Sequence, residues 1–359
     1  MLWRSKPLIS KPGYYTNASA TVANGLVVAG YSDPEGYDVG SGGFALIDPR
    51  SGAIIKVTPT VSRSDQAKGY AGGGLWDTPA FDPATRFLYY GTGNPDSKSK
   101  QDRNTDAIVK VDLRRHLSSG AANPRFGQIV AAYPGNVDQY TNAFQAAAKT
   151  PACTASDSSG LPWPLDDPVC GQLDLDFGAS PNLFRDASGR ELVGDLQKAG
   201  VYHVANARTM KPVWHVVVGG PCAACNAGST AVSGRGVDVV GTPGSTLFSL
   251  GRGGGAVNWA NPLTDGLHYE STSTANGVVY AIDNNGFLNA FSAATGQPLL
   301  KRQLSADTGA PTGGGLPSNG VAIAEGKVLV AANSTTGFLN STTGTNHAQE
   351  PGAYIVAYK

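Results

Sequence analysis

The chain has 359 residues, and its 27 Lys and Arg balance its 27 Asp and Glu, so the formal net charge is zero. This balance gives no electrostatic reason to expect nucleic acid or an anionic membrane as a partner. The 47 glycines and 23 prolines make up about a fifth of the residues, against a usual share of about 12%, which predicts many short strands joined by tight turns. The length suits two average domains or one large all-β ring.

The N-terminal residues MLWRSKPLISKPGYY lack the apolar stretch of a signal peptide. They read as the end of a strand, so we expect residues upstream of them, including a secretion signal. No run in the chain approaches the roughly 18 apolar residues of a membrane span. The sequence therefore predicts a secreted or periplasmic protein without a membrane span.

An internal repeat organises most of the chain. Its template is an alternating strand, a short polar turn that usually carries Gly, and a second short strand. The last template position holds Trp214, Trp259 and Leu300 in three copies, about 40 to 45 residues apart, and four short strands in such a period are the signature of a β-propeller blade. We expect Trp3, Trp214 and Trp259 to pack adjacent blades together. The four copies are FALIDPRSGAIIK (44–56), VYHVANARTMKPVW (201–214), TLFSLGRGGGAVNW (246–259) and LNAFSAATGQPLL (288–300).

The repeat predicts an all-β fold, with residues 1–359 forming one β-propeller domain of four-stranded blades. The segment 116–171, rich in Ala and Pro, is expected to be a long loop insertion within or between the second and third blades. We expect the N-terminal strand MLWRSK to complete the last blade and close the ring; if upstream residues are missing, the ring would instead be short by one or two blades. About six blades are visible, at residues 14–60, 70–115, 172–219, 221–263, 266–304 and 315–359.

The four cysteines are spaced in two pairs. Cys153 and Cys170 bracket a segment rich in Ser, Pro and Asp, which favours a loop-stapling disulfide in an exported protein. Cys222 and Cys225 have the CxxC spacing of redox or zinc sites, but no second CxxC or neighbouring His pair completes a metal site. Because Asn226 rather than His follows, covalent haem attachment is excluded, and a second structural disulfide is the favoured interpretation.

The segment GGGLWDTPAFDPATRFLYYGTGNPDS (72–97) carries an indole and a carboxamide, Trp76 and Asn94, at the two ends of one predicted hairpin. Together with the blade repeats, it resembles the quinoprotein dehydrogenases, the propellers of the pyrroloquinoline quinone (PQQ) dependent alcohol dehydrogenases, and especially their polyvinyl-alcohol-dehydrogenase-like branch. In that eight-bladed family the segment reads Gly-Gly-x-x-Trp, an Asp-Pro turn and Gly-[Ser/Thr]-Gly-Asn. The resemblance implies that Trp76 forms the floor under the flat quinone and that Asn94 ligates a calcium ion.

The resemblance implies three further site residues. Asp176 in LDLDFG matches the family's catalytic aspartate, which is also a metal ligand, with Asp174 as the fallback. Lys198 in DLQKAG matches the Lys or Arg that touches the quinone oxygens. Glu35 in SDPEG lies where the family places a calcium-ligating glutamate.

These residue types suit one another chemically. Calcium takes carboxylate and carboxamide oxygens, as Glu35, Asn94 and Asp176 offer, and it acts as a Lewis acid on a quinone carbonyl. Asp176 would remove the alcohol proton as a general base, and Lys198 would stabilise charge on the reduced quinone oxygens. Trp76 would exclude water and hold the ring plane by offset stacking.

The function that the resemblance implies is oxidation of alcohol hydroxyls, of small molecules or of a polymer, by hydride transfer to PQQ with the help of Ca²⁺. Because the chain contains no CxxCH, the electrons would pass to an external cytochrome c or another acceptor. The chain also lacks the adjacent cysteines that many family members place over the quinone, which leaves retention of the cofactor open.

Each candidate also has a structural interpretation. Asp176 and Lys198 could be ordinary turn residues, Glu35 fits the turn chemistry of SDPEG, and Asn94 could be a turn residue in the left-handed region. A non-catalytic propeller that binds a protein or a glycan through its loops is therefore the alternative. A lyase or hydrolase on the same ring has no motif here to support it.

Overall fold

A computed structural model gives the architecture of this chain. It describes residues 1–16, 18–34, 40–97, 101–135, 175–219, 230–234, 236–241, 246–263, 271–283, 286–308, 321–333 and 353–359. These residues form short strands joined by turns, with two single-turn helices, α1 (Arg63–Gln66) and α3 (Leu304–Thr308).

In the described part of the chain, six antiparallel sheets follow one another along the sequence. The first holds β1 (Thr21–Ala23), β2 (Leu26–Tyr31), β3 (Gly43–Ile47) and β4 (Ile54–Pro59). The second holds β5 (Ala80–Asp82), β6 (Phe87–Gly91), β7 (Ala107–Asp112) and β8 (Gln128–Pro134), and the third holds β9 (Asn182–Arg185), β10 (Glu191–Gln197), β11 (Val201–Asn206) and β12 (Pro212–Val217). The fourth holds β13 (Ala231–Val232), β14 (Gly236–Gly241), β15 (Thr246–Gly251) and β16 (Val257–Pro262), and the fifth holds β17 (Ser273–Ala275), β18 (Val278–Ile282), β19 (Phe287–Ser292) and β20 (Pro298–Gln303). The sixth holds β21 (Val321–Ala324), β22 (Lys327–Asn333) and β23 (Ala353–Tyr358).

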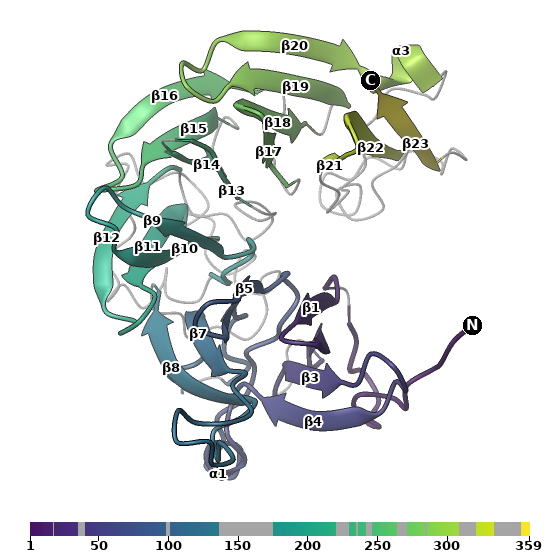
Figure 1. Cartoon of the computed structure of the whole chain (residues 1–359), viewed down its shortest axis with the longest axis vertical. Coiled ribbons are helices and arrows are strands. Elements are labelled where there is room, and N and C mark those ends of the chain that lie inside the picture. The colour runs from purple at the N-terminus through teal and green to yellow at the C-terminus, as the bar shows by residue number, and fades with distance from the viewer. Residues whose placement is uncertain are drawn as a thin grey trace.

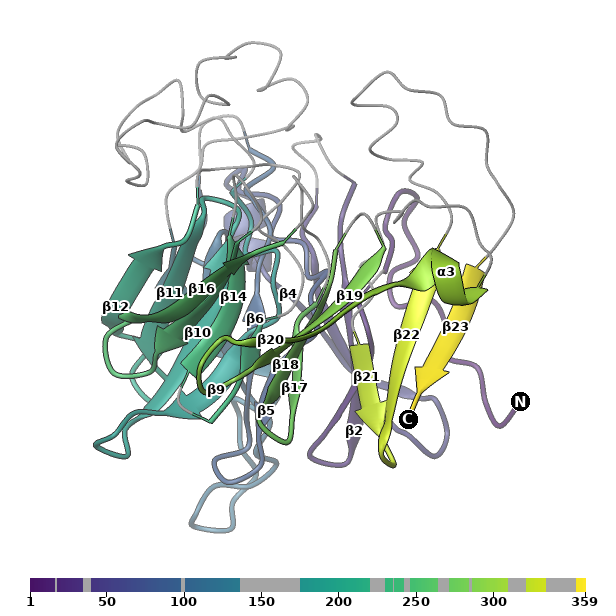
Figure 2. The same ribbon diagram turned by 90° about the horizontal axis from the view of Figure 1, so that it is seen from above.

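Each sheet is an up-and-down meander, because strands that follow one another in sequence pair antiparallel. Figure 1 shows the sheets side by side around a common centre, with β5, β13 and β17 towards the inside and β4, β8, β12, β16 and β20 on the rim. The innermost strands of successive sheets lie next to each other, as β5 and β9 do, and Figure 2 shows the same sheets from above. Radially arranged four-stranded meanders are the architecture of a β-propeller, so the predicted fold class is confirmed.

Apolar side chains between neighbouring sheets hold the blades together. The third strands β3 and β7 are buried along their whole length, because other sheets or segments cover both of their faces. Leu26 and Phe44 of the first sheet pack against Leu88 and Tyr90 of the second, and the rings of Phe44 and Tyr90 are stacked with centroids 5.9 Å apart. Each buried side chain of this size stabilises the fold by about 1.5–3 kcal/mol.

A tryptophan on the outer strand of one blade docks on a glycine in the next blade. Trp259 of β16 donates a hydrogen bond from Nε1 to the carbonyl of Ala293 at 3.0 Å and lies against Gly296 in the β19–β20 turn. Gly296 has a φ of +72°, and a Cβ there would lie 2.6 Å from the indole. Trp214 of β12 lies against Gly255 in the β15–β16 turn in the same way. The template position at the end of these two repeats is thus an interblade contact.

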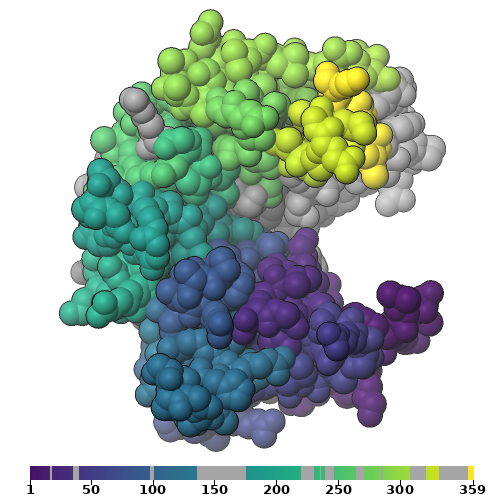
Figure 3. Space-filling view, viewed as in Figure 1, coloured from purple at the N-terminus to yellow at the C-terminus, as the bar shows by residue number. Residues whose placement is uncertain are grey.

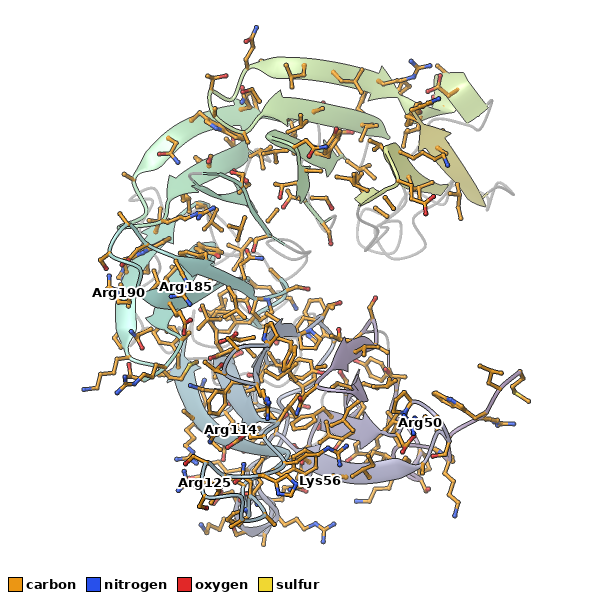
Figure 4. All side chains as sticks on the ribbon, viewed as in Figure 1. Arg50, Lys56, Arg114, Arg125, Arg185 and Arg190 are labelled. Carbon is orange, nitrogen blue, oxygen red and sulfur yellow. The ribbon has the colours of Figure 1, made fainter. Side chains whose placement is uncertain are left out.

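The first sheet has comparable contacts at its β3–β4 turn and at β4. Trp3 donates a hydrogen bond to the carbonyl of Pro49 at 2.7 Å and lies against Gly52 in the β3–β4 turn. Lys56 occupies the template position of β4, lies at the outer rim (Figure 4), and contacts Gly127 before β8 with its aliphatic stem. The predicted packing between blades is confirmed for Trp214 and Trp259, whereas Trp3 anchors the N-terminal segment to the first sheet.

Two expectations about the blades are corrected. The segment MLWRSK does not complete the last sheet: residues 1–7 form no strand, Trp3 anchors them to the first sheet, and the sixth sheet ends with β23. Figures 1 and 3 show the first and last sheets apart at the open side of the arc. The second blade extends to Pro134 rather than 115, because β8 lies inside the segment 116–171 and pairs with β7.

Several predicted features lie outside the described residues. They include the rest of the expected insertion, from 136 to 171, and all four cysteines. Among the described residues, no helix has the length and apolar character needed to cross a membrane.

Candidate functional site

Four candidate residues flank strands of the second and third sheets at equivalent places. Trp76 lies shortly before β5 and Asn94 shortly after β6. Because these two strands pair antiparallel, both residues lie at one end of the hairpin. Asp176 precedes β9 and Lys198 follows β10, which also pair antiparallel. Since β5 and β9 are neighbouring innermost strands, the two hairpin ends meet near the centre of the propeller.

Direct contacts join the four residues. The Nζ of Lys198 lies 2.8 Å from Oδ2 of Asp176, and the other carboxylate oxygen of Asp176 accepts a hydrogen bond from the backbone N–H of Asn94 at 2.5 Å. The same Nζ lies 5.2 Å from the centroid of the Trp76 ring. The structure therefore brings an aromatic surface, an ammonium, a carboxylate and a carboxamide-bearing residue to one place.

Burial makes this arrangement rigid. Asp176 and Lys198 are each 5% exposed, and the backbone N–H of Lys198 also donates to the carbonyl of Asp176 at 2.8 Å. The contacts of the Asp176 carboxylate with Lys198 and with the N–H of Asn94 are charge-assisted. Such hydrogen bonds are shorter and stronger than neutral ones. The carboxylate of Asp176 is consequently held in one orientation by groups from two sheets.

The glycines before Trp76 let the backbone lie directly against the Asn94 turn. Gly73 donates its N–H to the carbonyl of Asn94 at 2.9 Å, and Gly93 donates to the carbonyl of Gly74 at 2.8 Å. At Gly72 the backbone has a φ of +94°, and a Cβ would collide with the carbonyl of Asn94. The Gly-Gly-Gly and Gly-Thr-Gly-Asn motifs are therefore two halves of one close backbone contact that fixes Asn94.

Sequence reasoning missed two carboxyls here: Asp96, which contacts Asn94, and Asp33, which contacts Asp96. Asp96 accepts a long hydrogen bond from Nδ2 of Asn94 at 3.4 Å. Asp33 is 3% exposed, and its burial, only partly offset by hydrogen bonds that include the side chain of Asp96, raises its pKa to about 6. The side chains of Ser32 and Asp33 each keep one buried oxygen without a hydrogen-bond partner in the described structure.

Asp33 stands two residues before Glu35, the carboxylate chosen from the sequence, and Asp96 stands two residues after Asn94. The SDPEG turn and the GTGNPD turn therefore contained the signal for them. Glu35 itself and the fallback Asp174 lie outside the described residues.

The residues present fit a flat, anionic ring system and a hard cation beside it. The Trp76 ring is partly exposed and has the Lys198 ammonium beside it, which suits a planar ligand with negative oxygens. Asp176 and Asn94 offer the oxygen donors that calcium prefers. In the described part of the chain, no three His, Cys, Asp or Glu side chains are placed to hold a metal ion by themselves. A cation here would therefore need carboxamide and ligand oxygens in addition to carboxylates.

Comparison with known proteins finds a similar dehydrogenase sequence. No family model matches the sequence. The chain is 26% identical over 255 residues to a polyvinylalcohol dehydrogenase from Sphingopyxis sp. (strain 113P3), covering 65% of this chain and 35% of that protein. This similarity agrees with the family whose motifs the sequence resembles.

Solved structures share the fold at low sequence identity. A quinohemoprotein alcohol dehydrogenase from Pseudomonas putida HK5 has a TM-score of 0.62 and 15% identity, over 93% of this chain and 57% of that one. The quinohemoprotein alcohol dehydrogenase from Comamonas testosteroni has a TM-score of 0.57 and 16% identity, over 89% of this chain and 56% of that one. The chain thus spans about a third of the curated relative and somewhat more than half of these two solved chains.

Proposed function

We propose that this chain carries the reaction centre of a PQQ-dependent alcohol dehydrogenase that oxidises hydroxyl groups of small alcohols or of a polymer. The observation that carries the proposal is the meeting of Trp76, Asn94, Asp176 and Lys198 at one end of two neighbouring hairpins. The similarity to a polyvinylalcohol dehydrogenase supports alcohol oxidation in general.

The positions of four residues suggest a role for each, and the resemblance adds Glu35. Trp76 would pack against the quinone and keep water from it. The ammonium of Lys198 would stabilise negative charge on the ring oxygens, and Asn94, Asp176 and Glu35 would hold the calcium ion. When bound, PQQ and Ca²⁺ supply the two-electron acceptor and its Lewis acid.

Asp176 accepts the proton of the substrate hydroxyl. Its carboxylate is held by Lys198 and by the N–H of Asn94, so its orientation is fixed before a substrate binds. A carboxylate oxygen that accepts one hydrogen bond still has a lone pair for a substrate proton. The burial of the site removes competing water, which strengthens every electrostatic contact inside it. Proton acceptance and charge stabilisation thus come from two adjacent groups of opposite charge.

A secreted or periplasmic location and an external electron acceptor, such as a cytochrome c, complete the proposal. The sequence has no CxxCH with which to bind its own haem. In the test tube a dye would take the place of this acceptor.

One observation also favours a non-catalytic scaffold that binds a protein or a glycan. Both carboxylate oxygens of Asp176 already have partners within the chain, as they would in a purely structural ion pair. On that hypothesis the propeller would bind its partner through loops, and the Asp176–Lys198 contact would only join two blades.

The test is reconstitution of the purified chain with PQQ and Ca²⁺. We expect the wild type to keep the quinone absorbance after desalting and to reduce an acceptor dye when small alcohols or polyvinyl alcohol are added. Trp76→Ala should lose the quinone absorbance. Asp176→Asn should keep the quinone but lose turnover. Asp65→Asn is the matched control, because Asp65 also forms a 2.8 Å ion pair with a lysine, but at the surface. Absence of both quinone retention and dye reduction in the wild type would leave the scaffold as the function.

A further inference from the structure

Two more carboxyls lie within the contact between the second and third sheets, directly beside the site. Asp77 follows Trp76, and Asp195 lies in β10, three residues before Lys198. They are 5% and 0% exposed. Asp195 lies on the same face of β10 as Val193, whose neighbours in the apolar cluster include Tyr89 of the second sheet.

Gly91 at the end of β6 brings the two carboxyls together. Its N–H donates to Oδ2 of Asp77 at 2.9 Å. A Cβ on Gly91 would lie 2.6 Å from Oδ2 of Asp195 and 3.1 Å from Oδ2 of Asp77. The two carboxylate oxygens consequently lie within about 6 Å of each other, the range in which like charges perturb one another. Only a residue without a side chain leaves room for both.

No cation among the described residues compensates this pair. Oδ1 of Asp77 and Oδ2 of Asp195 are buried and have no hydrogen-bond partner in the described structure. The one lysine of the adjoining site, Lys198, is paired with Asp176. Two uncompensated charges in such a place would cost several kcal/mol each, so the pair cannot be doubly ionised without strong destabilisation.

The histidine and tyrosine side chains around the pair carry no charge at neutral pH. His203 lies opposite Asp195 across β10 and β11. Its burial, with a smaller contribution from His215, lowers its pKa to about 3, and its ring nitrogens bond to Tyr133 and Gln197. Burial raises the pKa of Tyr90, of Tyr133 (to about 12) and of Tyr202. No element packed against Asp77 and Asp195 therefore supplies a positive charge to them.

We propose that Asp77 and Asp195 share a proton at neutral pH, and that this acid pair fastens the Trp76 segment to the strand that carries Lys198. A proton on one carboxyl removes one of the two buried charges and turns an acceptor into a donor for the other carboxyl. Burial raises the pKa of both groups well above the usual range, and for Asp195 the neighbouring Asp77 adds to the effect. The pair is a positioning device, and it is independent of whether a quinone binds.

The pair makes stability fall with rising pH. The unfolded chain releases both protons above about pH 4, whereas the folded chain keeps one of them. Each pH unit above that point therefore multiplies the equilibrium constant for unfolding tenfold, until the folded pair ionises. Asp33 and Asp238 also have raised pKa values, but both are about 6, so above pH 7.5 they no longer contribute. Burial lowers the pKa of Lys110 to about 8, so above pH 8 the folded chain loses a proton that the unfolded chain keeps. This contribution has the opposite sign and is the same in the wild type and in variants of the pair.

Infrared spectroscopy and urea unfolding between pH 7.5 and 9 test the proposal. At pH 8 the wild type should show the C=O stretch of a protonated carboxylic acid, which the double variant Asp77→Asn, Asp195→Asn loses. The ratio of the unfolding constants of the wild type and the double variant should rise tenfold per pH unit, because the Lys110 contribution is common to both. Asp65→Asn should change neither, because Asp65 lies at the surface in an ion pair.

Three results would overturn the proposal. One is a wild-type spectrum without the acid band at pH 8, which needs no variant to fold. Another is a double variant whose pH slope equals that of the wild type. The third is a pH slope that depends on K⁺ or Ca²⁺ concentration, which would assign the space between the carboxyls to a bound cation. The positioning role has its own readout: the fluorescence of Trp76, taken as the difference from Trp76→Phe, should change when the wild-type pair ionises and stay constant in the double variant.

Discussion

The ion pair of Lys198 and Asp176 allows a quantitative test of how deeply the site is buried. In Lys198→Met the ammonium is removed, while an unbranched side chain of similar length still fills the space. The side chains of Lys198 and Asp176 are only 6% and 7% exposed, so the remaining carboxylate would lose its charge partner without gaining water. It would keep the N–H of Asn94.

The expected cost follows from these contacts. Two charges 2.8 Å apart attract by about 6 kcal/mol at an effective dielectric constant of 20. Part of this is cancelled because the lysine no longer has to be desolvated. Breaking buried pairs by removing one partner costs about 3–5 kcal/mol in general. Because Asp176 retains the Asn94 hydrogen bond, we expect about 3 kcal/mol for Lys198→Met.

Urea unfolding of Lys198→Met, Asp176→Asn and the double variant measures this. The double variant should be more stable than the sum of the two single effects predicts, with a coupling of at least about 1.5 kcal/mol. Lys68→Met is the control, since Lys68 and Asp65 are also 2.8 Å apart but are exposed, and it should leave stability unchanged. If Lys198→Met costs no more than Lys68→Met, or if the cycle shows no coupling, water reaches the site and the argument from burial is wrong.

Three further predictions concern the propeller. Gly296→Ala should destabilise the chain strongly, because a Cβ would meet the Trp259 indole at 2.6 Å. The control is Gly277→Ala, which has a similar φ of +77° and open space around it, so it should cost only the backbone strain of about 1 kcal/mol. Urea unfolding of the two variants measures the difference. Trp259→Ala should cost about 3–5 kcal/mol, and Trp259→Phe clearly less, in the same measurement. His203 has a pKa lowered by burial to about 3, so the folded chain lacks a proton that the unfolded chain binds below about pH 6.5. Stability should fall as the pH drops from 6.5 towards 3, and unfolding of His203→Gln at several pH values should lack this contribution.

The blade could be predicted from sequence because its signals are local. Alternating strands, a glycine in the turn and a tryptophan at the end of the repeat lie within one short segment. Trp214 and Trp259 stand at the same template position and make the same contact with the next blade. A pattern of this kind reflects geometry that every blade repeats.

The exceptions arise where the contact is not local. β8 was missed because an excursion between residues 113 and 127, with a bridge between His116 and Ala122, separates it from its partner β7. The N-terminal segment was assigned to the wrong sheet, because its residues do not specify which edge they meet. Trp3 packs on the turn of the first sheet, and this contact decides where the segment goes.

The site shows the same division between local and non-local information. Trp76, Asn94, Asp176 and Lys198 each lie in a recognisable motif, and the structure brings them together; their catalytic roles stay a prediction. Asp33, Asp96 and the Asp77–Asp195 pair have no motif of their own. They become informative only when residues from another sheet are seen beside them.

Stability and site geometry should therefore respond differently to changes in different parts of the propeller. Trp259 and Gly296 join the fourth and fifth sheets, and none of their described contacts reaches the second or third sheet. Their variants should lower stability without altering the Lys198–Asp176 contact in the molecules that remain folded. Asp77 and Asp195 lie in the contact that aligns Trp76 with Lys198, so their loss should change both properties at once. A Trp259 variant that disturbed the Trp76 fluorescence of the folded protein would show that the blades are coupled over the whole arc rather than through each interface separately.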